Sequence, residues 1–124
     1  LTLIMMLARQ FRVSQEEGAD ETVMERMIRF MDEHLDHVTL SMLSAEFGYH
    51  PAYISAQFSE KEGRTFSQIL LSQRMERAVF LMQHTDLSIE EITPMIGYTD
   101  KSNFYKAFRE YCGKTPRQFI QKET

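Results

Sequence analysis

The stretch Ser41–Gln68 reads SMLSAEFGYHPAYISAQFSEKEGRTFSQ, and its pattern returns in Glu90–Gln118 as EEITPMIGYTDKSNFYKAFREYCGKTPRQ. The first part of the pattern recurs 49 positions later and the second part 50 positions later. Such a repeat indicates that one small supersecondary unit occurs twice in the chain. Two copies suit a target that offers the same site twice, such as duplex DNA, whose major groove returns every helical turn.

Each copy has the spacing of a helix, a glycine turn and a second helix. In the first copy apolar residues at helical spacing lead to Gly48, and Pro51 can open the next helix. Ile54 and Phe58 share one face of that second helix, and the small residue Ser44 stands where the two helices would cross. A generic helical hairpin would show the same pattern once. Two copies in phase favour a helix-turn-helix, in which the second helix enters the groove.

The second copy carries clearer signals for the helix ends. Ser88, with a glutamate three residues later, predicts a capping box. Gly97 is expected to end the first helix, and Asp100 can cap the second. Phe104 and Phe108 are spaced to form the core face of the second helix.

Two further helices are expected, one before the first copy and one between the copies. An apolar stripe runs from about residue 20 to residue 35, and it comprises Val23, Met24, Met27, Ile28, Met31 and Leu35. A methionine-rich stripe could form a partner-binding groove, but core packing is the favoured interpretation. The second helix is predicted from about Thr65, its cap, to His84. A helix of this length spans about 27 Å, which suits recognition helices about 34 Å apart on DNA.

The expected fold class is therefore all-α, with two helix-turn-helix subdomains joined by a long linker helix. We expect four segments: a remnant of an upstream domain or linker (1–19), the first subdomain (20–64), the linker helix (65–84) and the second subdomain (85–124). The chain begins at Leu1 with an apolar stretch that no basic segment precedes, which is not typical of a signal peptide. We therefore expect that the sequence starts partway through a longer polypeptide.

Composition narrows the classes of function. No apolar run is long enough for a membrane span. A single cysteine, Cys112, excludes an internal disulfide framework and fits a reducing cytoplasm. His34 and His37 offer two ligands of a metal site but not a complete set. Without a glycine-rich phosphate loop or a paired carboxylate setting, we expect no enzyme, no cofactor and no metal.

The charge of the chain is unusual for a nucleic-acid binder. The 14 basic and 18 acidic side chains sum to −4. Residues 1–37 hold four basic and eight acidic side chains, whereas residues 38–124 hold ten of each, so that the repeats are neutral. Neutrality lowers the expected non-specific affinity for DNA, because neutralisation of phosphates drives that affinity. It does not exclude specific binding.

The core faces also predict which residues of the two recognition helices point outward. These residues correspond in pairs, 50 positions apart. The expected DNA-contacting residues are Ala52, Ser55, Ala56 and Ser59 in the first copy, Ser102, Tyr105, Lys106 and Arg109 in the second, and Lys101 as an additional candidate. The first face offers methyls and short hydroxyls, and the second offers two cations and a phenol. The cations could also be ordinary solvated charges, but on a recognition helix they have the reach to contact guanine and phosphate.

One block of the sequence closely resembles the DNA-binding region of AraC/XylS-type transcription regulators. The block comprises Arg74-Met-Glu-Arg-Ala78, Asp86-Leu-Ser-Ile-Glu-Glu-Ile92, Gly97-Tyr98, Ser102-Asn-Phe104, Ala107-Phe108, Tyr111, Gly113 and Thr115-Pro116. The resemblance extends over about residues 22 to 121. It implies seven helices that form two helix-turn-helix units, which bind adjacent major grooves. It also implies that the outward residues touch bases, with Ser59 and Arg109 meeting phosphates instead.

The same resemblance implies partners beyond double-stranded DNA. It implies contact with RNA polymerase at a promoter, a sensor or dimerisation domain upstream of this sequence, a small-molecule effector acting only through that domain, and a full-length protein able to dimerise. Three residues depart from the pattern of these regulators. Pro94 lies inside the first helix of the second unit and should kink or loosen it. Thr93 replaces the usual alanine, and Ala56 stands where arginine is frequent.

A second hypothesis follows from these departures. The neutral repeats, the first face with few donors, and Pro94 would also fit a helical protein-interaction module that keeps the fold but has lost DNA binding.

Overall fold

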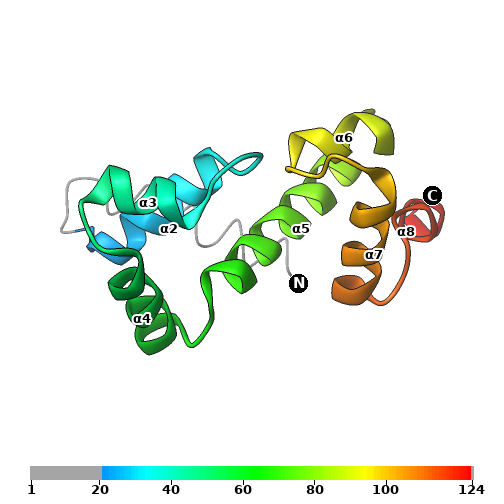
Figure 1. Cartoon of the computed structure of the whole chain (residues 1–124). Coiled ribbons are helices and arrows are strands. Elements are labelled where there is room, and N and C mark those ends of the chain that lie inside the picture. Colours follow the sequence, from blue (N-terminus) through cyan, green and yellow to red (C-terminus); the bar gives the residue numbers. More distant parts are fainter. Residues whose placement is uncertain (1–20, 124) are drawn as a thin grey trace. The chain divides into compact units, whose positions relative to one another are not determined.

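The computed structural model describes residues 21–123, with side chains to residue 120, and these residues form helices and no strand (Figure 1). The seven described helices are α2 (Val23–Glu33), α3 (Leu40–Phe47), α4 (Pro51–Glu62), α5 (Phe66–His84), α6 (Ile89–Met95), α7 (Lys101–Cys112) and α8 (Pro116–Glu123). The all-α prediction, with two helix-turn-helix subdomains and a long helix between them, is confirmed. The expectations about residues 1–19 lie outside the described part of the chain.

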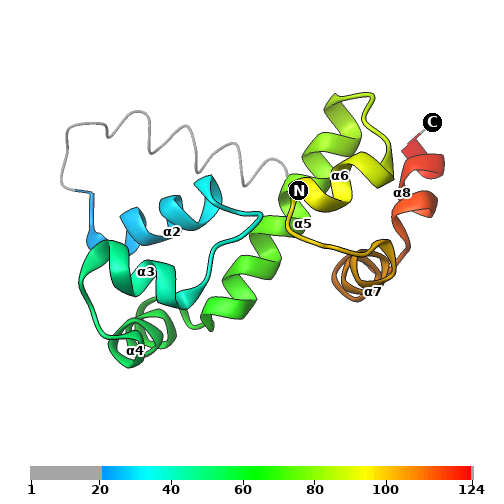
Figure 2. The same cartoon turned by 45° about the horizontal axis from the view of Figure 1, so that its top comes forward.

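The chain divides within α5 into two compact units, which we call the N-terminal unit (Leu1–Leu70) and the C-terminal unit (Leu71–Thr124). The N-terminal unit holds α2, α3 and α4, and the C-terminal unit holds α6, α7 and α8. In the N-terminal unit α4 follows α3 through a short turn and lies against it, which both views show (Figures 1 and 2). The division into four segments at residues 19, 64 and 84 remains a prediction.

The caps predicted from the sequence are confirmed. Thr65 Oγ1 accepts a hydrogen bond from the backbone N–H of Gln68, whose side chain accepts one from the backbone N–H of Thr65. Thr115 and Gln118 form the same reciprocal pair at the start of α8. Ser88 and Asp100, which were also predicted as caps, accept a bond from the first turn of their helix, and so does His50 at the start of α4. Each bond satisfies an N–H group that the helix itself leaves without a partner.

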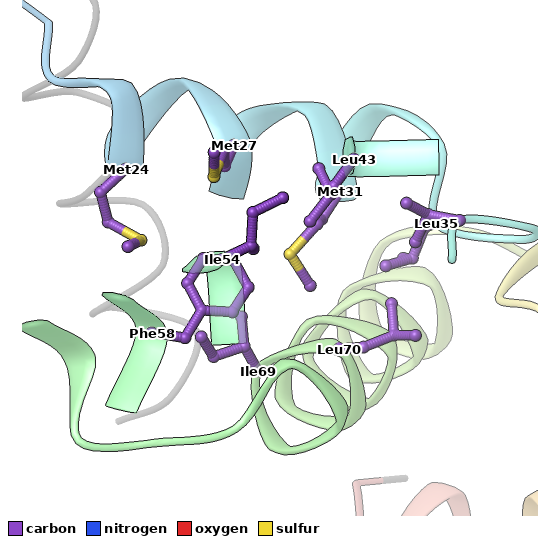
Figure 3. Close-up of a cluster of buried hydrophobic side chains, with 10 residues drawn as sticks. Met24, Met27, Met31, Leu35, Leu43, Ile54, Phe58, Ile69 and Leu70 are labelled. Carbon is purple, nitrogen blue, oxygen red and sulfur yellow. The ribbon is translucent and has the colours of Figure 1, made fainter. Parts of the chain in front are cut away.

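The N-terminal unit packs around the methionines of α2. Figure 3 shows Met24, Met27 and Met31 on the side of α2 that faces Ile54 and Phe58 of α4. The buried residues of this core are Met24, Met27, Met31, Leu35, Val38, Leu43, Ile54, Phe58, Ile69 and Leu70. The methionine-rich stripe is therefore part of the core, as the favoured interpretation predicts. Unbranched, polarisable methionine side chains fill the irregular space between helices that cross at an angle.

The C-terminal unit has a smaller and more aromatic core. Its buried residues are Met75, Ala78, Ile89, Ile92, Ile96, Phe104 and Phe108. The rings of Phe104 and Phe108 meet edge to face with their centroids 5.7 Å apart, and Phe119 of α8 meets Phe108 in the same way at 5.8 Å. This arrangement directs the positive edge of one ring at the negative face of the next. It buries the side of α7 that carries the two phenylalanines.

The two helix-turn-helix turns differ at the end of their first helix. In α3, Gly48 has φ 75°, and its N–H donates to the carbonyl of Ser44 at 2.9 Å. In α6, Pro94 has no N–H to donate to the carbonyl four residues back. That helix ends at Met95, one residue after the proline, and the Gly97 N–H donates to the carbonyl of Pro94 at 3.1 Å. The helix that contains Pro94 is thus shorter than α3, with seven residues against eight, and it closes in a tighter turn; the expected kink or loosening remains a prediction.

Gly97 also lies directly against an arginine of the same unit. Its φ is 101°, and a Cβ at this position would lie 2.7 Å from Cζ of Arg74. The guanidinium carbon of Arg74 lies 5.6 Å from the centre of the Tyr98 ring. Burial raises the pKa of the Tyr98 hydroxyl, and the nearby Arg74 cation partly opposes that shift. Arg74, Gly97 and Tyr98 therefore form one packing unit, although the arginine and the glycine are 23 positions apart in the sequence.

The glycines of the two turns provide a matched pair for a stability test. Alanine at a positive φ costs about 1–2 kcal/mol in backbone strain. We expect Gly48→Ala to cost about that much, because nothing lies within 4 Å of the point that the new Cβ would occupy. Gly97→Ala should cost more than that, because Arg74 must also leave its place beside the turn and the Tyr98 ring. Hydrogen exchange of buried amides in each unit measures both costs, and equal losses would contradict the role of Arg74.

Candidate nucleic-acid interface

The residues predicted to contact DNA lie on α4 and α7, the second helix of each helix-turn-helix. The core side of each helix is fully buried, at Ile54 and Phe58 in α4 and at Phe104 and Phe108 in α7. The predicted residues that are exposed on the other side are Ala52, Ser55, Ala56, Ser59, Lys101, Ser102, Lys106 and Arg109. The outward direction is confirmed for all of these except Lys101, which was predicted only as a DNA contact, and contact with DNA remains a prediction for all of them.

Tyr105 corrects the predicted face of α7. Its side chain is half-buried, packs against the C-terminal core and meets Phe104 edge to face at 6.2 Å. The hydroxyl oxygen is buried and has no hydrogen-bond partner among the described residues. The expectation that this phenol points outward is therefore wrong. A residue at the flank of a helical face can lean either way, and an aromatic ring gains more from apolar contact than from exposure.

Lys101 is held at the edge of α7 by an acidic side chain of α6. Its Nζ donates to Glu90 Oε2 at 2.9 Å and lies 5.9 Å from the centre of the Tyr105 ring. The hydrogen bond from Lys101 lowers the pKa of the Glu90 carboxyl, and the same bond raises the pKa of Lys101. Arg117 of α8 adds to the positive field at this carboxylate. Lys101 is thus a cation whose charge is partly neutralised before any phosphate approaches.

Lys106 and Arg109 differ from Lys101 in this respect. Both side chains are exposed, and neither forms an ion pair with a residue of the range 21–120. The corresponding positions of α4 are Ala56 and Ser59, which are also exposed. At these matching positions, the cationic reach toward a phosphate or a guanine therefore belongs to α7, whereas the lysine of α4, Lys61, lies in the last turn of its helix.

The structure adds exposed residues that the sequence prediction missed. Tyr53 of α4 has 48% of its surface exposed, and Asn103 at the corresponding position of α7 is exposed as well. Both precede the core-facing residue of their helix by one position. The signal was present in the sequence, because Tyr53 lies three residues before Ala56 and so shares its face.

Other kinds of site find little support in the structure. The rings of His34 and His37 are 5.6 Å apart, and Nδ1 of His37 lies 2.6 Å from Asp36. Within the described range, no group of three or more metal-ligating side chains comes together. Cys112 is half-buried, and this burial raises the pKa of its thiol, which disfavours the reactive thiolate. None of the helices described is both long and apolar enough to cross a membrane.

Comparison with known proteins agrees with this arrangement. Residues 43–122 match the profile of a protein family described as "Helix-turn-helix domain". The chain belongs to this family, in its AraC/XylS type. The match spans both helix-turn-helix units and α5, so the recurring sequence pattern and the family coincide.

Relatives of the chain in the AraC/XylS family are bacterial regulators. The chain is 31% identical over 121 residues to the uncharacterized transcriptional regulatory protein YesN of Bacillus subtilis, covering 91% of this chain and 33% of that protein. It is 35% identical over 82 residues to the transcriptional activator AggR of Escherichia coli, covering 66% of this chain and 31% of AggR. The chain thus spans about a third of the length of these relatives.

A solved structure of the same type supports the fold. The DNA-binding transcriptional dual regulator from Escherichia coli K-12 aligns with a TM-score of 0.75 and 27% sequence identity. The alignment covers 84% of this chain and 94% of that chain.

The buried hydroxyl of Tyr105 allows a test of its corrected orientation. A buried donor without a partner costs about 1–3 kcal/mol, so Tyr105→Phe should stabilise the C-terminal unit by about 1 kcal/mol. Tyr53→Phe, at an exposed position, should change stability by less than about 0.5 kcal/mol. Thermal unfolding followed by circular dichroism measures both. A destabilised Tyr105→Phe variant would show that the hydroxyl has a partner after all.

The Lys101–Glu90 ion pair predicts that Glu90 weakens binding to DNA. Glu90→Gln should tighten binding several-fold and steepen the slope of log affinity against log salt by up to about 0.9, because Lys101 becomes available to a phosphate. Glu110→Gln is the matched control, since it removes a charge from the exposed side of α7 without releasing a lysine. Titration of duplex DNA at several salt concentrations compares the two variants. Equal effects would show that only net charge matters.

Proposed function

We propose that this chain is the sequence-specific DNA-binding region of an AraC-type transcription regulator, with α4 and α7 as its two recognition helices. One observation carries the proposal: the same helix-turn-helix occurs twice, and in each the side of the second helix opposite the core is exposed. A helix presented in this way fits the major groove, whose width admits one α-helix. Membership of the AraC/XylS family supports the same function.

The two recognition helices offer different chemistry to DNA. The outward side of α7 carries Lys106 and Arg109, which can reach phosphates or the acceptor edge of guanine. The matching residues of α4 are Ala56 and Ser59, which cannot. We propose that α7 supplies most of the electrostatic affinity and the guanine-reading contacts. The alternative is a protein-interaction module without DNA binding. The exposed cations of α7 speak against it.

The length of α5 supports binding to adjacent major grooves. Its 19 residues run from Phe66 to His84 without an internal glycine or proline, and such a helix rises about 28 Å. We propose that α5 sets the separation of the two recognition helices at about one turn of DNA, roughly 34 Å.

The regulator as a whole is a wider proposal, because this chain spans only a part of its relatives' length. We propose that it acts in the cytoplasm, that RNA polymerase is a second partner at the promoter, and that any small-molecule effector or dimer contact belongs to another part of the protein.

Selection of DNA from a random pool tests the function and the separation of the helices together. The chain should enrich duplexes with two conserved half-sites about ten base pairs apart. Insertion of five or of ten base pairs between the half-sites should weaken binding strongly, because α5 holds the two recognition helices at one fixed separation. A single conserved half-site would contradict the use of both helices. Failure to enrich any duplex would favour the protein-interaction module.

A mutational comparison tests the unequal roles of the two helices. Lys106→Ala and Arg109→Ala should each weaken binding to the selected duplex by about 1–3 kcal/mol where the side chain contacts a base. A lost phosphate contact should instead flatten the salt slope by about 0.9. Ser55→Ala and Ser59→Ala in α4 are the matched changes and should cost less. Equal losses in both helices would contradict a dominant α7.

A further inference from the structure

The exposed side of α4 and the turn that precedes it carry an apolar surface that α7 and its turn lack. We call it the tyrosine–alanine patch, and it consists of Tyr49, Ala52, Tyr53 and Ala56. Both tyrosines are exposed, at 37% and 48%, and both alanines are exposed as well. Their spacing of three or four residues places Tyr53 next to Ala56, and Ala52 one turn before Ala56.

The patch is held in a fixed shape by local bonds. The rings of Tyr49 and Tyr53 stack with their centroids 5.1 Å apart and their planes at 24°. Ser44 Oγ donates to the carbonyl oxygen of Tyr49 at 2.6 Å, and His50 Nδ1 accepts from the backbone N–H of Ala52 at 3.1 Å. These bonds fix the backbone between the two stacked tyrosines. A surface ordered in advance loses less conformational entropy when a ligand covers it.

The C-terminal unit shows that the fold itself does not require this exposure. Tyr98, which corresponds to Tyr49, is half-buried between Arg74 and Phe104. Tyr53 is replaced by Asn103, and Ala56 is replaced by Lys106. The same turn and helix can therefore fold with the tyrosine of the turn half-buried and with polar residues at the positions of Tyr53 and Ala56. The exposed aromatic pair is a property of the N-terminal unit alone.

We propose that the tyrosine–alanine patch recognises the 5-methyl groups of thymine in the half-site under α4. This inference rests on the proposed function. Thymine is the base that presents an apolar group in the major groove, and the patch lies on the groove-facing side of the recognition helix. The patch itself carries no cation and therefore has no means of bidentate contact with guanine. Apolar contact is the chemistry that remains, and thymine methyls match it.

Replacement of thymine by uracil tests the proposal, because it removes the methyl group and leaves base pairing unchanged. The half-site under α4 is identified first. It is the half-site in which a base change weakens binding of the Lys106→Ala variant as much as it weakens binding of the wild type. Uracil at thymines of this half-site should weaken wild-type binding about four-fold for each methyl that is contacted. Uracil in the other half-site should change binding by less than two-fold.

Two variants link the effect to the patch. Tyr53→Asn installs the residue found at the corresponding position of α7, and it should make binding insensitive to uracil under α4. Lys106→Ala should keep the full sensitivity to uracil, although it binds more weakly. Circular dichroism checks that both variants are folded, which the exposure of both residues leads us to expect.

The outcomes separate this inference from the proposed function. Binding that ignores uracil in the half-site under α4, or a selected half-site without thymine, overturns the inference and leaves the DNA-binding function intact. If uracil has no effect but Tyr53→Asn abolishes activation of transcription, the patch contacts a protein instead, which also overturns the inference. A chain that binds no duplex at all overturns both.

Discussion

The structure depends on the way in which α5 supplies residues to two separate cores. Ile69 and Leu70, near its start, are buried in the N-terminal unit, and Met75 and Ala78 are buried in the C-terminal unit. Domains as small as these bury only a modest fraction of their surface, so each buried side chain is a large share of the stability of its unit. Each half of α5 is therefore needed by the core of its own unit. The continuity of the helix matters for the spacing that we propose on DNA.

The two helix-turn-helix copies show how one pattern is stabilised in two ways. At the end of the first helix, Ser44 in one copy uses its hydroxyl to hold the carbonyl of Tyr49. Its counterpart Thr93 donates its hydroxyl to Ile89 within the helix, and its carbonyl accepts from the N–H of Tyr98. The turn that follows is open at Gly48 but covered by Arg74 at Gly97. These differences leave Tyr49 exposed and Tyr98 half-buried. They therefore change which side chains each unit exposes on the surface that we propose contacts DNA.

Charge is distributed over the two recognition helices as unevenly as apolar surface. Lys106 and Arg109 project from α7 without an acidic partner among the side chains described, whereas Lys101 at the same helix is paired with Glu90. The outward side of α4 has short hydroxyls, methyls and aromatic rings instead. A neutral pair of repeats can therefore contain one helix suited to phosphate and guanine and one suited to apolar contact. Such a division limits non-specific affinity, which grows with the number of phosphates neutralised, without removing the means of sequence recognition.

The sequence by itself determined the features that depend on near neighbours along the chain. The helices, the glycine turns and the caps at Thr65, Ser88, Asp100 and Thr115 could be predicted because each involves residues no more than four positions apart. The same holds for the buried pairs of α4 and α7 and for seven of the eight residues predicted to point outward. Helical periodicity decides which side of a helix is apolar, and the apolar side must face the core.

Only the tertiary structure decided the features that join distant residues or lie at the flank of a face. Arg74 covers Gly97 across 23 positions, and Glu90 binds Lys101 across 11 positions and a turn. Tyr105 lies at the boundary between the two sides of α7, where periodicity favours neither direction. Its ring packs against the apolar surface of Phe104 and its neighbours in the core. Residues close in sequence do not indicate that this surface is there. The exposure of Tyr49 and the burial of Tyr98 have the same cause, because an identical Gly-Tyr pair is covered only where another element brings a side chain over it.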